Sequence, residues 1–352
     1  MKGHVIAARR SAVAPRAGAF RDLSLEQLAT PVIAALLADA GIVAEQVDEV
    51  IVANAIGTGG NPARRIALAA GLPERVAGLT VDRQCAGGLD ALLLAGAMVA
   101  AGMARVVVAG GVESYSQRPE RRMPGAVAPY EEAPFTPWED RDPFMAEAAD
   151  ALATRLGIDR DRQDAWAIAS HAKARAADMR AEIVPLAGLA TDAFARDLTP
   201  ALAARAKVIH GSITAANAAV AADGAAFALV VAPDIAARAA RALAFHGQTL
   251  GATPWEPGTA PVAAMRALVG PNPPDLAEVM EAYAAQAIAC VEGAGLDPAT
   301  VNRKGGALAR GHPVGASGAI LAVRLFHDLR QGRGLAAIAA AGGIGTAVMF
   351  EA

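Results

Sequence analysis

The length, composition and charge of this chain set the first limits on what it does. The chain has 352 residues, 54% hydrophobic and 19% charged, with a formal net charge of −3. It is therefore long enough for two packed lobes or a duplicated core, and it lacks the basic excess of a general nucleic-acid binder.

The cysteine content and the N-terminal stretch indicate in which cellular compartment the protein is expected. Two cysteines, Cys85 and Cys290, are too few for a disulfide framework and lack the spacing of a zinc site. The stretch MKGHVIAARRSAVAPR has no continuous apolar core, and Gly, Asp or Arg interrupts the longer apolar runs. We expect a cytoplasmic protein that binds neither nucleic acid nor membrane.

Short apolar runs alternate with helical patterns through the first 114 residues, which predicts an α/β fold. In the first helical pattern Ser24 and Gln27 are spaced as a capping box, Gly41 is placed to end the helix, and Pro31 is expected to kink it. The predicted strands lie at 4–8, 47–53 and 106–110, and the predicted helices at 24–40, 62–70 and 89–103.

The middle of the chain differs in composition. A stretch rich in proline and charge begins at Tyr115 and is followed by helical patterns at 146–156 and 161–181. Such a segment is too structured for a linker and indicates an inserted lid or binding subdomain. We divide the chain into an N-terminal half (1–114), an inserted loop domain (115–215) and a C-terminal half (216–352).

The C-terminal half repeats the alternation of the first. Residues 276–282 resemble 48–54, and residues 335–346 resemble 104–114. Self-similarity at this period predicts a duplicated α/β unit rather than an array of small repeats.

Cys85, in RQCAGGLD, precedes an apolar helical pattern. At a helix N-terminus the backbone N–H groups favour the thiolate, which predicts a lowered thiol pKa and a nucleophile. Cysteine is also a common small core residue, so the residues alone leave both interpretations open.

His312 lies in a turn between Gly311 and Gly315, ahead of a second long helical pattern. If the halves are duplicates, the turns of Cys85 and His312 are equivalent and meet at the centre of the molecule. A thiol and an imidazole so placed form a nucleophile–base pair. The alternative is a structural turn histidine.

Several motifs in one order resemble the thiolase family, over essentially the whole chain. They are VDRQCAGGLDA, VVVAGGVESYS and NRKGGALARGHPVGASGA. The resemblance implies a five-layered α-β-α-β-α fold with two similar five-stranded sheets, and a homodimer or homotetramer. It implies coenzyme A or acyl-CoA as substrate, with no permanently bound cofactor and no metal. It also implies that Cys85 accepts the acyl group and that His312 deprotonates it.

Two departures concern the acyl-acceptor step of a thiolase. The position of the second catalytic cysteine is Ala339, and the Asn- or His-Glu-Ala-Phe block reads Met280-Glu281-Ala282-Tyr283. Alanine transfers no proton, a thioether is a weak acceptor, and a further branch of the family would have its cysteine at Ala282. Glu281 is the nearest acid, but the resemblance implies a structural role.

The resemblance also implies coenzyme A contacts at Met145, Asn217 and Ala218, and an oxyanion site from the backbone N–H groups of Cys85 and Ala341. Cys290 is expected in the core. Two functions remain open: an acyltransferase acting through an acyl-Cys85, with an ordinary or a non-standard acceptor, or a non-catalytic subunit that binds coenzyme A.

Overall fold

The computed structural model describes residues 3–57 and 59–352. Its strands form one long path in the order β11-β12-β13-β10-β1-β9-β5-β3-β4. The strands are β1 (Gly3–Ser11), β2 (Ala14–Pro15), β3 (Glu49–Ala53), β4 (Leu79–Val81), β5 (Val106–Ser114), β6 (Ile183–Val184), β7 (Val208–His210), β8 (Ile213–Thr214), β9 (Ala222–Val231), β10 (Leu243–Gly251), β11 (Leu276–Val279), β12 (Arg333–Ala340) and β13 (Ile344–Glu351).

The helices alternate with these strands, as the sequence predicts. They are α1 (Leu25–Ala40), α2 (Pro62–Ala69), α3 (Gly87–Ala100), α4 (Met145–Leu156), α5 (Arg160–Ala176), α6 (Pro200–Ala204), α7 (Pro233–Ala236), α8 (Val262–Val269), α9 (Ala284–Gly293), α10 (Ala307–Arg310) and α11 (Val314–Asp328). Short 3₁₀ helices include η2 (Gln84–Ala86) and η4 (Pro257–Thr259). In this part of the chain no helix is both long and apolar enough to cross a bilayer.

The sheet consists of two half-sheets with matching topology. In the first, β3 pairs in parallel with β5, and β5 is antiparallel to β9; in the second, β11 pairs in parallel with β12, and β12 is antiparallel to β13. Among the described strands, the two half-sheets are joined by a short antiparallel pairing of β1 with β10, from Gly3↔Phe245 to Val5↔Leu243. The repeat predicted from residues 48–54 and 276–282 thus corresponds to β3 and β11.

The second half-sheet differs from the expectation of five strands. Among the described residues the counterpart of β4 is reduced to a single parallel bridge between Ala277 and Val301. The Asn302 side chain replaces the rest of the ladder, since it accepts from the Val279 N–H at 2.9 Å and donates to the Val279 carbonyl at 2.8 Å. The backbone of Asn302 is left-handed, with φ of 45°, which turns the chain away from β11.

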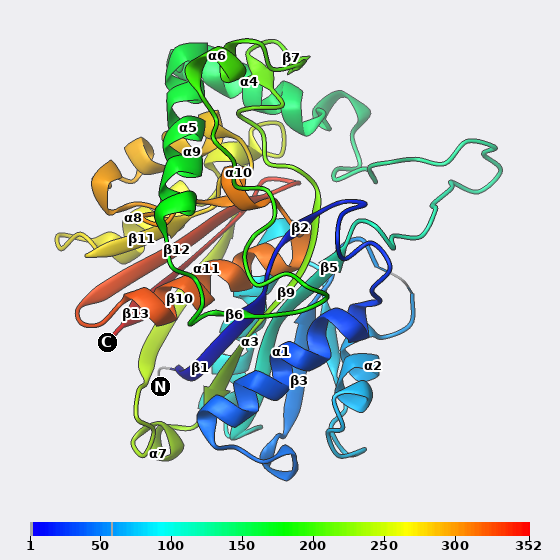
Figure 1. Cartoon of the computed structure of the whole chain (residues 1–352), viewed down its shortest axis with the longest axis vertical. Coiled ribbons are helices and arrows are strands. Elements are labelled where there is room, and N and C mark those ends of the chain that lie inside the picture. The colour runs from blue at the N-terminus through cyan, green and yellow to red at the C-terminus, as the bar shows by residue number, and fades with distance from the viewer. Residues whose placement is uncertain (1–2, 58) are drawn as a thin grey trace.

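Five layers follow from the burial of both faces of each half-sheet. On β13, Val348 and Phe350 face the core shared with α3 and α11, while Ala347 and Met349 face the core under α8 and α9. Alternation of this kind places successive side chains on opposite faces. With α1 and α2 outside the first half-sheet, the predicted α-β-α-β-α arrangement is confirmed (Figure 1).

The two central helices cross in close contact, which glycine permits. A Cβ on Gly88 of α3 would lie 2.4 Å from the backbone nitrogen of Ala319, and one on Gly318 of α11 would lie 2.6 Å from the nitrogen of Leu89. The first turns of α3 and α11 therefore lie side by side at the centre of the molecule. This crossing brings the turn of Cys85 to that of His312.

Between β5 and β9, helices α4, α5 and α6 form the upper part of the molecule in Figure 1, whereas β6 descends to pair with β1. A buried Arg10 on β1 ties this segment down through Glu182 and Asp192. Because β9 pairs within the first half-sheet although it follows residue 216, we propose that the change of halves falls between β9 and β10.

The first helix shows how local chemistry sets an element. Ser24 accepts from the backbone N–H of Gln27, whose side chain accepts from the Ser24 N–H, and Gly41 ends the helix in a left-handed conformation. These caps are as predicted. The α-helix continues unbroken through Pro31.

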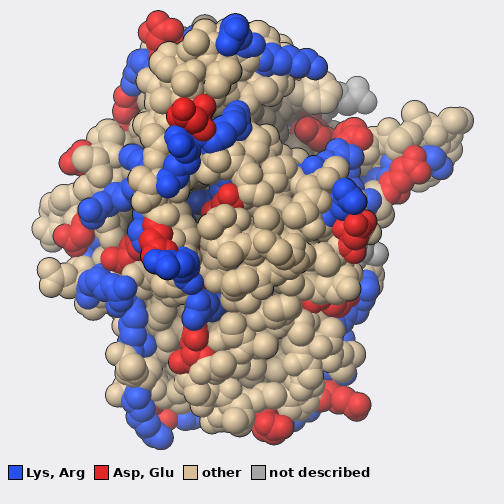
Figure 2. All heavy atoms as spheres, in the orientation of Figure 1, with Lys and Arg blue, Asp and Glu red and all other residues tan. Residues whose placement is uncertain are grey.

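Acidic and basic side chains are intermixed over the face of the molecule shown in Figure 2.

Candidate active site

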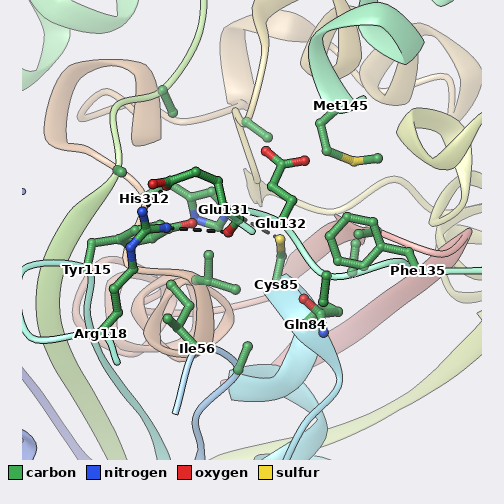
Figure 3. Close-up of a pocket in the computed structure, with 18 of the residues that line it drawn as sticks. Ile56, Gln84, Cys85, Tyr115, Arg118, Glu131, Glu132, Phe135, Met145 and His312 are labelled. Atoms are coloured by element: carbon green, nitrogen blue, oxygen red, sulfur yellow. Dashed lines mark hydrogen bonds and ion pairs between the residues drawn. The ribbon is translucent and has the colours of Figure 1, made fainter. Parts of the chain in front are cut away.

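A pocket of about 640 Å³ opens above the crossing of the central helices. Its floor is formed by Cys85, His312 and the end of β12, and its walls come from residues 115–135, from α4 and from the segment around η4. This volume is typical of small-molecule sites. Figure 3 shows Cys85 and His312 facing one another at its base.

The turn that carries Cys85 is tightly constrained. Gln84 has a positive φ of 48°, and its backbone N–H is held by the Asp82 carboxylate at 2.8 Å. Residues without a glycine's freedom adopt such angles where the surroundings enforce them, often at functional sites. Cys85 then lies in η2, immediately before α3, as predicted.

Cys85 and His312 form a hydrogen-bonded pair. The Nε2 atom of His312 lies 3.2 Å from the Cys85 Sγ atom, and its Nδ1 atom lies 2.7 Å from the Ser317 hydroxyl. Ser317 donates its own proton to the Pro313 carbonyl, so its oxygen is free to accept from Nδ1–H. The hydroxyl therefore favours the tautomer whose Nε2 accepts the thiol proton.

The charge state of this pair differs from the prediction. Burial raises the pKa of the Cys85 thiol to about 12, although the backbone N–H groups of Ala341 and of Cys85 itself oppose the rise. Burial, with the nearby Arg310, lowers the pKa of His312 to about 4. The prediction of a lowered thiol pKa was wrong, because desolvation outweighs the helix terminus. Both groups are neutral near pH 7.

The same backbone donors favour negative charge on the Cys85 sulfur. The backbone N–H groups of Ala341 and Cys85 lower the pKa of the Cys85 thiol and so favour its charged form, and Ala341 follows directly after β12. Donors fixed in this way stabilise negative charge that develops beside the nucleophile. They need no particular side chain.

A buried carboxylate holds the two sides of the site together. Glu113 at the end of β5 accepts from the N–H of Ala55 at 2.9 Å and from the N–H of Gly315 at 3.0 Å. It thereby fixes the chain after β3 to the first turn of α11. Burial raises the pKa of Glu113 to about 7.

The positions that depart from the thiolase pattern lie around this pair. Ala339, at the end of β12, and Ala282 line the pocket, whereas Met280 is buried in the central core. Glu281 accepts hydrogen bonds from Trp166, Ser170, Asn302 and Leu308. Its carboxylate is thus occupied within the fold.

The predicted coenzyme A contacts are only partly brought together. Met145, at the start of α4, and Ala341 line the pocket, but Asn217 and Ala218 are not among its lining residues. Asn217 is fully buried, and its amide binds the Thr214 N–H and the Asp164 carboxylate. In this turn it is Ala219 that reaches the pocket.

Cys290 lies in the core, as predicted: it is fully buried on α9, and its thiol donates to the Gly258 carbonyl at 3.1 Å. Within residues 3–57 and 59–352 there is no cluster of His, Cys, Asp and Glu side chains suited to a metal ion.

Sequence reasoning missed three groups at the site. Ser317 follows His312 by five residues, in the Gly- and Ser-rich start of the next helical pattern, and this hydroxyl close to the histidine in sequence was a usable signal. Tyr115 follows the GGVES turn directly. Glu132 also lines the pocket, yet it stands in a proline-rich stretch without periodicity, where nothing in the sequence predicts its direction.

The fold and this site define a class, the enzymes that work through a thiol–imidazole pair at the centre of a duplicated α/β fold. Family models for the thiolase N-terminal and C-terminal domains match residues 4–234 and 236–352. The chain belongs to the thiolase family, and it is therefore an acyltransferase.

Individual relatives agree with this assignment. YhfS of Bacillus subtilis, provisionally named an acetyl-CoA C-acetyltransferase, is 39% identical over 100% of this chain and 99% of its own. VraB of Staphylococcus haemolyticus, with the same provisional name, is 36% identical over 99% and 98%. Both cover essentially the whole of this chain, which confirms the end-to-end resemblance.

Solved structures give the same picture. The Bacillus anthracis acetyl-CoA acetyltransferase is 32% identical with a TM-score of 0.88, over 100% of this chain and 99% of that one. The Ascaris suum Acat5 thiolase, solved in complex with coenzyme A, is 27% identical with a TM-score of 0.93 and full coverage of both chains.

Proposed function

We propose that this protein is an acyl-CoA acyltransferase that carries the acyl group on Cys85, acting as an acetyl-CoA acetyltransferase or 3-ketoacyl-CoA thiolase. The observation that carries the proposal is the 3.2 Å contact between Cys85 Sγ and His312 Nε2, and the effect of the Ala341 and Cys85 N–H groups, which favour negative charge on the sulfur, supports it. A nucleophile, a base and oxyanion donors are the parts that acyl transfer requires.

In the first half-reaction His312 Nε2 takes the thiol proton as the sulfur attacks the thioester carbonyl. The Cys85–carbonyl bond forms, the bond to the coenzyme A sulfur breaks, and the imidazolium returns its proton to that sulfur. Transfer during attack suits a pair in which both groups are neutral at rest. The N–H groups of Cys85 and Ala341 stabilise the oxyanion.

We propose coenzyme A thioesters as substrates, with no other bound cofactor. The pocket volume of about 640 Å³ and its reach from Cys85 to Met145 on α4 suit an extended thioester arm. We also propose a homodimer or homotetramer. Strand β4 ends the first half-sheet, and no described strand pairs with its outer side. A second copy of the chain could therefore pair with this edge.

The test is acylation followed by intact mass. Wild-type protein incubated with acetyl-CoA, and separately with longer acyl-CoAs, is expected to gain one acyl group that is absent in Cys85→Ala. Cys290→Ala serves as the matched control, because it removes the only other cysteine from a fully buried site. It is expected to keep the adduct.

Failure of every chain length to acylate the wild-type protein would overturn the proposal. Tight binding of coenzyme A without an adduct would instead favour a non-catalytic partner subunit. Ala339 and Met280 are the residues on which that alternative rests, since each stands where the resemblance implies a polar group for the second half-reaction.

A further inference from the structure

The second half-reaction, which rests on the function proposed above, requires a group that moves the α-proton of the second acyl group. Ala339 and Ala282 line the pocket where such a group belongs, and a methyl group transfers no proton. His312 serves the sulfur through its Nε2 atom, and its Nδ1 atom is engaged by Ser317. The structure must supply the proton carrier from elsewhere.

Most titratable groups of the pocket wall are already occupied. Glu131 forms an ion pair with Arg118, and Glu120 pairs with Arg122. Glu113 lies below the pocket floor and is held by backbone N–H groups. Each of these carboxylates has a partner within the protein.

Two tyrosines flank the reacting pair. Burial raises the pKa of both Tyr115 and Tyr283, and the charges at Cys85 and Glu132 add to the rise. A phenol with a raised pKa stays protonated near neutral pH, so it can donate a hydrogen bond but is a poor base. Neither tyrosine suits removal of a proton from carbon.

Glu132 is the carboxylate that remains. It lines the pocket at an exposed position, and in Figure 3 its side chain lies between Cys85 and Met145. Cys85, Tyr115 and Tyr283 line the same pocket as Glu132. In the described part of the chain, no residue hydrogen-bonds or ion-pairs with this carboxylate.

We propose that Glu132 is the acid–base residue of the second half-reaction and takes the part left vacant by Ala339. Its carboxylate faces the space above Cys85, where the methyl group of a second acetyl-CoA would meet the acyl group. Carboxylates act as bases toward protons next to carbonyl groups in other enzymes.

The step balances without a further reactant. Glu132 removes a proton from the α-carbon, and the carbanion attacks the acyl carbon on Cys85. The carbon–carbon bond forms, the bond to Cys85 Sγ breaks, and the sulfur leaves as a thiolate. The proton held by Glu132 restores the thiol. In thiolysis the same residue donates that proton to the departing enolate.

The experiment separates the two half-reactions in Glu132→Gln, which keeps the size of the side chain. We expect the acyl adduct on Cys85 to form at the wild-type rate within about twofold, because acylation does not use Glu132. Thiolysis of acetoacetyl-CoA is expected to fall about 10²–10⁴-fold, the usual contribution of a positioned acid or base. Asp140→Asn is the matched control, because Asp140 is also exposed and also lies in the segment between β5 and α4, which we call the covering segment.

Two further readouts bear on the chemistry itself. Wild-type protein in D₂O is expected to exchange the methyl hydrogens of acetyl-CoA, and Glu132→Gln is expected to lose this exchange at least about tenfold. Ala339→Cys in the Glu132→Gln background is expected to restore part of the thiolysis, because it returns a proton carrier to the same space.

The outcomes distinguish this inference from the proposed function. Absence of any adduct in the wild-type protein overturns the acyl-enzyme. A normal adduct with unchanged thiolysis in Glu132→Gln overturns the role of Glu132 alone. An adduct in the wild-type protein with no thiolysis at all, for any 3-ketoacyl-CoA, likewise overturns the role of Glu132 and leaves acylation intact.

Discussion

Replacing Arg10 by methionine tests how the segment between β5 and β9 is attached to the first half-sheet. Arg10 is fully buried on β1 and donates to Glu182 at 2.7 and 2.9 Å and to Asp192 at 2.7 and 3.0 Å. Methionine keeps much of the volume but removes the positive charge. Two buried carboxylates would then lose their main partner.

The expected loss follows from what stays behind. Breaking a buried ion pair by removing one partner costs about 3–5 kcal/mol, since the other charge remains desolvated. Arg324 lies 3.8 Å from Glu182 and still offsets part of that penalty, and Asp192 keeps the Val13 N–H at 2.9 Å. We therefore expect the free energy of unfolding to fall by about 3 kcal/mol at pH 7, the lower end of this range.

The loss has a defined pH dependence. Burial alone raises the pKa of Glu182 and Asp192, but the charge of Arg10 outweighs it and holds each pKa below its ordinary value. These carboxylates thus stabilise the wild-type fold above their unfolded pKa of about 4, and that stability is lost as pH falls through the folded pKa. Without Arg10, burial raises the pKa of both carboxyl groups. They are then protonated at a higher pH, and this protonation removes the cost of burying their charge in the variant.

The difference between the two proteins should therefore shrink as pH falls from 7 toward about 4. Urea unfolding at pH 7, 6, 5 and 4 measures it. Arg9→Met, which removes a partly exposed pair with Asp39, is the control and should cost less than about 1 kcal/mol. A difference of under 1 kcal/mol at pH 7, or one that is constant with pH, would refute the reasoning.

Three further predictions concern the central layer. Ser317→Ala removes the acceptor of His312 Nδ1–H and should slow acylation about fivefold with KM unchanged, since one hydrogen bond is worth ~1 kcal/mol; an unchanged rate contradicts the assigned tautomer. Because the His312 pKa is lowered to about 4, acylation in stopped-flow should be independent of pH from ~6 to ~8 and fall only near that pKa, whereas a fall centred near 6.5 contradicts it. Gly88→Ala places a Cβ 2.4 Å from the Ala319 nitrogen and should destabilise by about 1–3 kcal/mol. Gly251→Ala, with nothing within 4 Å, should be nearly neutral in the same thermal unfolding measurement.

The parts of the fold that sequence predicts best are those fixed by short-range chemistry. Ser24 and Gln27 form the predicted capping box, and Gly41 ends the helix. The pair of Cys85 and His312 was also accessible, because two Gly-rich turns occupy equivalent places in a repeated pattern. Capping motifs and internal repeats can both be recognised from the order of the residues alone.

The features that the sequence does not predict depend on contacts between residues far apart in the chain. The pKa of Cys85 is set by desolvation from both halves of the molecule, which its neighbours in the sequence do not reveal. The replacement of a fifth strand by the Asn302 side chain needs the position of β11. Glu132 lies in a segment without helix or strand. No periodicity in the sequence therefore indicates that its side chain lines the pocket.

The locations of the two half-reactions explain how one can change without the other. In the proposed function, acylation depends on Cys85, on His312 and on the Ala341 N–H, which lie beside the central helices and β12. Ala339 pairs with Gly345 through its backbone, so we expect that alanine in place of the cysteine implied by the resemblance changes the chemistry and leaves this pairing intact. A carboxylate from the covering segment reaches the same space from outside the core. Proton transfer at that position can therefore change by substitution of a surface residue, while the acylation geometry is constrained by packing.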